Sequence, residues 1–242
     1  MTSSASQISA SVDALEKEFD IIAHNMANVS TVGFKRRCNS FTKAMAAQGG
    51  GSEGGAGGDS SQGAFDFSQG TLVQTDRTLD VALYGKGFFV LESQDGPLYT
   101  RHGIFQTNQN GQIVDSMGRL VSGASGPLIV PPNADVSEIY VDSTGRVTAG
   151  KAAIGQFRVV EFADKENQLV PVGSSCFSAP KDVRPKDAAS VIVQQGYEEA
   201  SNVKLVDELV NMIKVSRLYE ANMKMTTVNR DNTSSVIGVA MG

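Results

Sequence analysis

The chain has 242 residues, and 21 Lys and Arg against 26 Asp and Glu give it a formal net charge of −5 at pH 7. With this acidic balance, no Trp and 7% aromatic residues, it offers neither a basic field nor a base-stacking surface, so no nucleic-acid partner is expected. No apolar run reaches the roughly 18 residues of a membrane helix, and residues 1–10 do not resemble a cleavable signal peptide, so we expect neither membrane insertion nor cleavage.

The first predicted element is an amphipathic helix that ends near Asn28. Its large apolar residues alternate steps of four and three, a seam typical of helices that pack on other helices. The alternative is the wider stripe of an ordinary core helix. Gly33 supplies the positive φ of a C-terminal stop. The predicted assembly seam on this helix consists of Ile8, Val12, Leu15, Phe19, Ile22 and Met26.

A Gly- and Ser-rich tract follows the helical region. Residues 49–63 read GGGSEGGAGGDSSQG, a composition that cannot bury enough apolar surface to fold alone. We therefore predict a linker or loop over residues 48–64.

The middle of the chain, residues 65–198, is predicted to be β-rich and antiparallel, with a sandwich-like or barrel-like arrangement. Short β-prone runs such as Val81–Leu83 and Phe88–Leu91 alternate with turn signals such as Asn110-Gly111, and no helical pattern lies between them. The set of runs is self-contained, so a fragment of residues 65–198 is expected to fold alone.

The last segment returns to helix after an N-cap expected at Ser201 or Asn202. Its predicted seam is formed by Leu205, Leu209, Met212, Tyr219 and Met223. The predicted fold class is therefore α+β: residues 1–47 and 199–242 form a discontinuous helical assembly domain, in which the two amphipathic helices make a coiled-coil-like pair, and residues 65–198 form the β-rich domain.

The sequence carries no recognisable catalytic, cofactor-binding or metal-binding constellation, and no enzyme activity or small-molecule substrate is predicted. Gly85-Lys86-Gly87 lacks the rest of a phosphate loop and predicts a tight turn. The segment 108–111 (NQNG) has too few carboxylates for a calcium loop and predicts a hairpin turn. Cys38 and Cys176 lie too far apart for a metal spacing and are expected to be free thiols. A possible Asp80–Arg101 pair is expected to lie at the surface and to contribute little.

Three blocks of the sequence resemble the flagellar basal-body rod and hook protein family. Residues 20–35, DIIAHNMANVSTVGFK, are similar to its N-terminal motif. Residues 78–91, TLDVALYGKGFFVL, and residues 98–121, LYTRHGIFQTNQNGQIVDSMGRLV, look like its central block. Residues 196–225 are similar to its C-terminal signature. The matching motif residues are Asn25, Ala27, Asn28, Thr31, Gly33, Phe34, Lys35, Ser201, Asn202 and Val203. The blocks occur in the family's order, although His24 stands where Asn is usual and Met26 where Leu is usual.

The resemblance implies a structural subunit of the flagellar basal-body rod that polymerises helically through its terminal helices and transmits torque from motor to hook. It also implies partners, namely copies of itself, other rod subunits and the flagellar type III export apparatus, and a location in the rod across the periplasm, reached without a cleaved signal peptide. Details of the C-terminal block favour the proximal-rod member over the distal-rod member. Two alternatives stay open: a hook or hook-scaffolding member, and a rod-associated cell-wall hydrolase.

Overall fold

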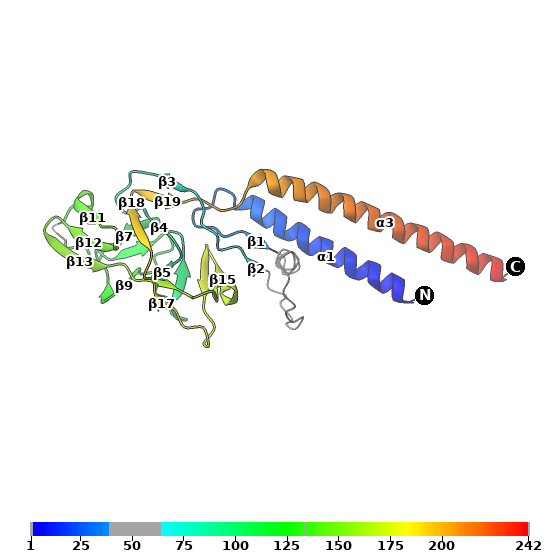
Figure 1. Cartoon of the computed structure of the whole chain (residues 1–242), viewed down its shortest axis with the longest axis horizontal. Helices are drawn as coiled ribbons and strands as arrows, with labels where there is room; N and C mark the ends of the chain where they lie inside the picture. The colour runs from blue at the N-terminus through cyan, green and yellow to red at the C-terminus, as the bar shows by residue number, and fades with distance from the viewer. Residues whose placement is uncertain (1, 39–63, 133, 242) are drawn as a thin grey trace. The chain divides into compact units, whose positions relative to one another are not determined.

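A computed structural model describes residues 2–38, 64–132 and 134–241, with side chains described for residues 10–38, 64–132 and 134–228. Apart from Ala64, the predicted linker at 48–64 lies outside the described residues. Among these residues there are two α-helices, α1 (Thr2–Ala27) and α3 (Leu205–Met241) (Figure 1). The end of α1 agrees with the predicted stop. The predicted N-cap is wrong, because α3 begins only at Leu205.

Short strands make up most of the chain between the helices. They are β1 (Arg37–Cys38), β2 (Ala64–Phe65), β3 (Leu72–Gln74), β4 (Val81–Tyr84), β5 (Phe88–Leu91), β6 (Leu98–Thr100), β7 (Phe105–Thr107), β8 (Ile113–Asp115), β9 (Ser122–Gly123), β10 (Gly126–Pro127), β11 (Ile139–Val141), β12 (Arg146–Ala149), β13 (Ala152–Gln156), β14 (Val159–Glu161), β15 (Val170–Gly173), β16 (Cys176–Ser178), β17 (Lys186–Asp187), β18 (Ile192–Gln195) and β19 (Tyr197–Glu199). Two 3₁₀ turns, Val136–Glu138 and Glu166–Gln168, lie among them.

The largest sheet has six strands in the order β15-β16-β6-β5-β14-β17. A three-stranded sheet, β11-β12-β13, and the two-stranded ladders β18-β4, β19-β3, β7-β8 and β10-β9 complete the body. These strand pairs are antiparallel. Because β18 and β19 pair with β4 and β3, the end of the β-rich segment folds back on its beginning.

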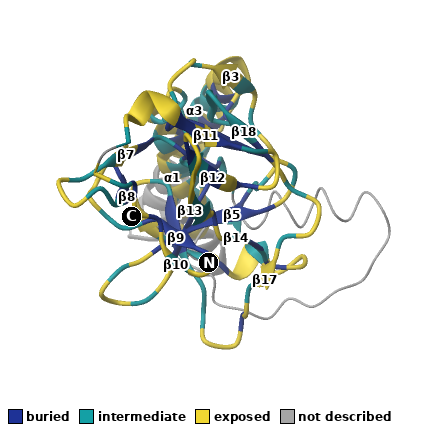
Figure 2. Ribbon diagram, turned by 90° about the vertical axis from the view of Figure 1, so that its left-hand side faces the viewer, coloured by how far each residue is buried: buried dark blue, intermediate teal, exposed yellow. Residues whose placement is uncertain are grey.

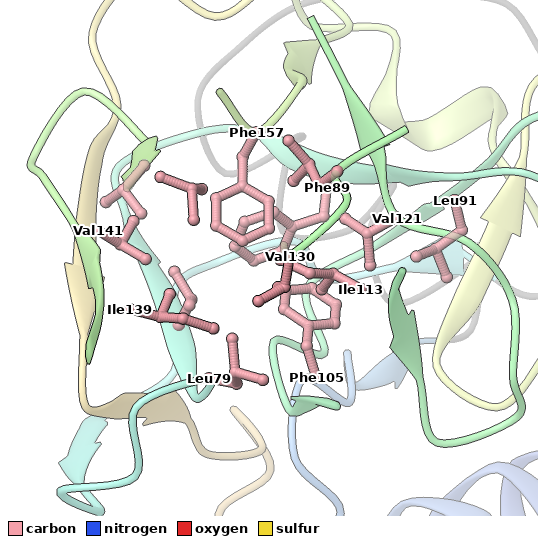
Figure 3. Close-up of a cluster of buried hydrophobic side chains, with 14 of the residues drawn as sticks. Leu79, Phe89, Leu91, Phe105, Ile113, Val121, Val130, Ile139, Val141 and Phe157 are labelled. Carbon is pink, nitrogen blue, oxygen red and sulfur yellow. The ribbon is translucent and has the colours of Figure 1, made fainter. Parts of the chain in front are cut away.

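Strand β5 divides two hydrophobic clusters. Phe89 and Leu91 belong to the main core, which Figure 3 shows, and Phe88 and Val90 belong to a second cluster. Successive side chains of a strand point to opposite faces, so both faces of β5 are covered. This double burial explains the continuous apolar sequence FFVL. In the main core Phe89 meets Phe105 edge to face, with ring centroids 5.2 Å apart.

Two predicted turns are confirmed. Gly85, with φ 108°, lies in the turn between β4 and β5, so Gly85-Lys86-Gly87 connects strands. The segment 108–111 joins β7 to β8, and the Asn108 Oδ1 atom accepts from the backbone N–H groups of Asn110 and Gln112 at 2.9 and 3.0 Å. Among the described residues no cluster of three or more His, Cys, Asp or Glu could hold a metal ion. No described helix has the length and apolar character needed to cross a bilayer.

The predicted fold class is wrong. The described chain is mainly a β-rich body with one helix at each end, and no coiled-coil pair of amphipathic helices is shown in it. The strands also spread over several small sheets instead of the sandwich or barrel that was predicted. The physical reason why no coiled-coil pair is shown lies in α3. Its exposed apolar residues are not confined to one seam: at 3.6 residues per turn, Val210 and Leu218 lie about 140° and 220° around the axis from Leu205.

The chain divides into two compact units. The helical unit contains α1, β1 and α3, and the β-rich unit contains residues 28–36 together with the described residues from Ala64 to Val203. Buried residues, dark blue in Figure 2, gather in the strands of the β-rich unit, including β5 and β12.

Candidate assembly site

The segment that follows α1 is a turn built from the predicted family motif. Thr31 donates its hydroxyl to the Asn28 side chain at 3.1 Å, and its backbone N–H bonds the Asn28 carbonyl at 3.1 Å. Gly33 has φ 65°, and its N–H donates to the Glu199 carbonyl at 2.7 Å. A Cβ at Gly33 would lie 2.4 Å from the backbone nitrogen of His102. Both the conformation and the close approach therefore require glycine here.

Three buried charged side chains meet at Glu199. Lys35 donates its Nζ to Glu199 Oε1 at 2.6 Å, and Arg101 donates its Nη1 to Glu199 Oε2 at 3.3 Å. The exposed fractions of the three side chains are 1–3%. The backbone N–H of Gly70 adds a bond to Oε1 at 2.8 Å. The single carboxylate therefore joins three segments that lie far apart in sequence.

We call Lys35, Arg101 and Glu199 the charge cluster, and backbone carbonyls accept further hydrogen bonds from its two cations. Lys35 also donates to the Ser68 carbonyl at 2.7 Å, and Arg101 donates to the carbonyls of Leu83 and Gly85 at 3.3 and 2.6 Å. Burial lowers the pKa of Lys35 and of Arg101, while the Glu199 carboxylate acts in the opposite direction on both. Two cations that share one buried carboxylate form a structural joint, since Glu199 bonds both Lys35 and Arg101.

The predicted motif residues Ser201, Asn202 and Val203 follow Glu199 in the chain and make further hydrogen bonds in this region. Asn202 accepts from the backbone N–H of Arg36 at 2.7 Å and donates to the Asp66 carbonyl at 2.8 Å. Ser201 accepts from the N–H of Val203 at 3.2 Å, and Val203 is buried. Asn202 thus connects residue 202 to residues 36 and 66 of the β-rich unit. Ser201 and Asn202 therefore do not cap α3, which begins at Leu205.

In the helical unit, the buried amide of Asn25 makes the key contacts. Its Oδ1 accepts from the N–H of Arg37 at 2.8 Å and its Nδ2 donates to the carbonyl of the same residue at 2.9 Å. The Nδ2 group also lies 3.4 Å from Glu208 Oε1 on α3. A second polar contact, Ser11 Oγ to Asn222 Oδ1 at 3.3 Å, joins α1 to α3 further along.

The predicted seam residues are mostly not the ones that the chain buries. On α1, Ile22 is buried, Val12, Leu15 and Met26 are half-buried and Phe19 is 41% exposed; the side chain of Ile8 lies outside the described residues. On α3, Met212 is half-buried, whereas Leu205, Leu209, Tyr219 and Met223 are exposed. Among the side chains of α3 that are described, residues 205–228, Glu208 and Val215 are buried. The helical unit therefore contacts itself through a partly polar strip and leaves large apolar side chains uncovered.

Comparisons with known proteins give the family of this chain. Residues 82–149 match the flagellar hook protein FlgE/F/G D1 domain, and residues 194–239 match the flagellar basal body rod FlgEFG protein C-terminal region. The flagellar basal-body rod protein FlgG of Agrobacterium fabrum is 34% identical over 93% of this chain and 94% of its own length. The chain belongs to the flagellar basal-body rod protein family.

Relatives with two different names within this family are similar to the chain. The FlgG protein of Bacillus subtilis is 32% identical, covering 93% of this chain and 94% of its own length. The FlgF protein of Caulobacter vibrioides is 29% identical, covering 92% and 89%. The predicted resemblance to an FlgF- or FlgG-type rod protein is confirmed.

The two matched regions of the rod family contain most of the buried polar residues described above. Arg101 falls in the D1 match, and Glu199, the Ser201–Val203 motif and Glu208 fall in the C-terminal match. Lys35 belongs to the predicted motif, whereas Glu199 and Glu208 were not predicted, because Glu is common on exposed surfaces and nothing in the spacing marks these two as buried.

The prediction of a surface pair between Asp80 and Arg101 is wrong. Arg101 and Asp80 are both buried, and Arg101 pairs with Glu199, whereas Asp80 lies 3.7 Å from Arg77. No disulfide joins Cys38 and Cys176. Arg119 donates to the Cys176 sulfur at 3.1 Å, and burial raises the pKa of that thiol.

Proposed function

We propose that this chain is a structural subunit of the flagellar basal-body rod that polymerises helically through α1 and α3, with copies of itself and other rod subunits, and so transmits torque from motor to hook. One observation carries the proposal beyond family membership: α3 exposes large apolar side chains on several sides, including Val206 at 71%. Among the described side chains of α3 only Glu208 and Val215 are buried within the chain, and large apolar side chains exposed on several sides of a helix are typical of a surface that another protein covers.

The seam residues Leu15, Phe19, Leu209, Met212 and Tyr219 belong to this proposed contact surface. Each large apolar side chain that leaves water in the assembly contributes about 1.5–3 kcal/mol. Single helices gain little stability alone, since helix nucleation is unfavourable in water. Packing between copies supplies the burial that α3 lacks within one chain.

A deletion strain tests the proposal. Cells without the chain should have a rod that stops short and should not swim, as seen by electron microscopy and motility assay, and the wild-type chain supplied in trans should restore both. Normal flagella in the deletion strain would contradict the proposed function.

The role is proposed to be non-enzymatic, with export through the flagellar type III apparatus and no cleaved signal. A muropeptide-release assay separates this from the hydrolase alternative, because turnover by the purified chain would require a catalytic site. The mass of the N-terminal peptide from isolated rods tests whether the chain is cleaved. The preference for a proximal position stays a prediction, and complementation of strains that lack FlgF or FlgG tests it.

A further inference from the structure

The outer face of α1 is acidic. Asp13, Glu16 and Asp20 are exposed, and their three-and-four spacing places them within about 60° on one side of the helix. The side that contacts α3 through Ser11 and Asn25 lies roughly opposite. Lys17 lies next to the three carboxylates, and the net charge of this side of α1 stays negative. We call Asp13, Glu16 and Asp20 the acidic edge.

The outer face of α3 is basic. Lys214, Arg217 and Lys224 are exposed and lie within about 80° of one another around the axis. Glu208 and Asn222, which contact α1, lie about 150° away on average. Glu220 borders the three cations but leaves them in excess. We call Lys214, Arg217 and Lys224 the basic edge.

The two edges lie at the same level of the helix pair. Ser11 bonds Asn222, and Asn25 lies 3.4 Å from Glu208, so positions two heptads apart on α1 meet positions two heptads apart on α3 in reverse order. Figure 1 shows the two helices running in opposite directions. In this register Glu16 is level with Arg217, and Asp20 is within one residue of Lys214. The pair therefore presents opposite charges on its two outer edges.

The exposed apolar side chains of the two helices also complement each other in size where they lie at the same height along the helix pair. Beyond the acidic edge, α1 exposes Ala23 and Ala27 on the same side. Beyond the basic edge, α3 exposes Val210 and Val206, which are level with those alanines and 44% and 71% exposed. Small side chains allow the backbone of a neighbouring helix to approach closely, and the valines would then lose their contact with water.

We propose that the acidic edge of one copy of this chain docks on the basic edge of a second copy. The proposal rests on the proposed rod function and identifies one contact between neighbouring copies in the rod. No ion pair joins any of these six charged side chains to another described residue of the chain, so the charges are available to a neighbour. Each copy uses different surfaces on its two sides, and such a heterologous contact extends into a helical polymer when it does not close. Charge complementarity sets the orientation and the choice of partner.

Paired charge reversals test the contact in cells that lack the wild-type chain. Variant A carries Glu16→Lys and Asp20→Lys, and variant B carries Lys214→Glu and Arg217→Glu. Each alone should reduce the amount of subunit in isolated rods about tenfold or more, because like charges then face each other. The chain with all four reversals should return to near wild-type amounts. So should co-expression of A and B, since the edges of A are both basic and those of B are both acidic.

A matched control reverses two exposed charges of the β-rich unit, Lys151→Glu and Lys181→Glu, and should leave incorporation unchanged. Amounts in whole cells and in rods are both measured, so that loss of the chain is separated from loss of assembly. Full incorporation of A and B, or rescue by the fourfold reversal without rescue by co-expression, would overturn the contact between copies. Absence of the wild-type chain from rods would instead overturn the proposed function.

Chemical cross-linking gives a second measurement that does not depend on folding of the reversed variants. A carbodiimide treatment of wild-type rods should yield dimers that contain an Asp20–Lys214 or Glu16–Lys214 linked peptide. The Lys214→Arg variant keeps the charge but lacks the amine, so it should assemble normally and lose these linked peptides. Rods that yield no such dimer would contradict the proposal.

Discussion

The two units of the molecule differ in how far they cover their charged and large apolar side chains. The β-rich unit joins three of its buried charged side chains, Lys35, Arg101 and Glu199, in one cluster, and it covers both faces of β5 with its own residues. The helical unit buries a polar strip around Asn25 and Glu208 and leaves Val206, Leu209 and Ile213 in water. One unit covers its core with its own residues, whereas the other exposes an apolar surface that the proposed assembly would cover.

The largest effect is expected from removing the ends of the β-rich unit. A fragment of residues 28–203 contains Lys35, Arg101 and Glu199, and we expect it to melt cooperatively. The fragment 65–198, which was expected to fold alone, lacks Lys35 and Glu199, so Arg101 loses the carboxylate that it pairs with. Leaving a buried charge without its partner costs about 3–5 kcal/mol, so this fragment should melt at a much lower temperature. Circular dichroism melts of both fragments check this, and equal melting temperatures would show that the cluster adds nothing.

Glu199→Ala should destabilise the body by about 3–5 kcal/mol, because Lys35 and Arg101 would stay buried without an anion. The free energy of unfolding from urea titration measures the change. Glu198→Ala is the matched control: the neighbouring side chain is half-buried, and a loss below about 1 kcal/mol is expected. Similar losses in the two variants would contradict a special role of Glu199.

Gly33→Ala should destabilise the body more than Gly118→Ala. Both glycines have positive φ, 65° and 80°, so both substitutions carry a backbone penalty of about 1–2 kcal/mol. Only at Gly33 would the new Cβ also meet backbone atoms, at 2.4 Å from the His102 nitrogen, whereas nothing lies within 4 Å at Gly118. The difference in unfolding free energy isolates the close approach, and a zero difference would mean that the backbone relaxes freely.

A smaller effect concerns Cys176. Burial raises the pKa of its thiol, so less thiolate forms at pH 8 than in an ordinary cysteine, and the group is also shielded from reagents. We expect slow alkylation by iodoacetamide in the native chain, fast alkylation in urea, and no peptide that links Cys38 to Cys176 without reductant. Mass spectrometry measures all three. Rapid native labelling would show that the body opens at β16.

Much of the β-rich body could be predicted from sequence because strand runs and turns are local signals. Val81–Leu83 and Phe88–Leu91 correspond to β4 and β5, and the turn at Asn110-Gly111 follows from residues that favour it. Glu199 was missed because its role depends on Lys35 and Arg101, which lie far away in sequence. Local patterns carry no information on such pairing.

The predicted assembly seam stays a prediction. Apolar spacing on α3 fits several stripes at once, and the spacing alone does not say which one faces α1 and which face other copies. The contact between α1 and α3 uses Asn25, Glu208 and Asn222, polar residues that a search for apolar seams leaves out. The division of residues into domains, 1–47 with 199–242 and 65–198, stays a prediction that the fragment melts address.

The most direct measurement compares Leu209→Asp with Val172→Asp. Both side chains are apolar and exposed in the single chain, at 42% and 55%, but Leu209 lies on α3 and Val172 lies on β15 of the body. Each variant is expressed in the deletion strain, and basal bodies are fractionated and swimming is scored. Leu209→Asp should leave the melting temperature of the body unchanged and abolish incorporation into rods, because an unpaired carboxylate is strongly disfavoured in an apolar contact. Val172→Asp should be incorporated and support swimming. Full swimming with Leu209→Asp subunits present in purified rods would contradict assembly through the exposed apolar surface of α3.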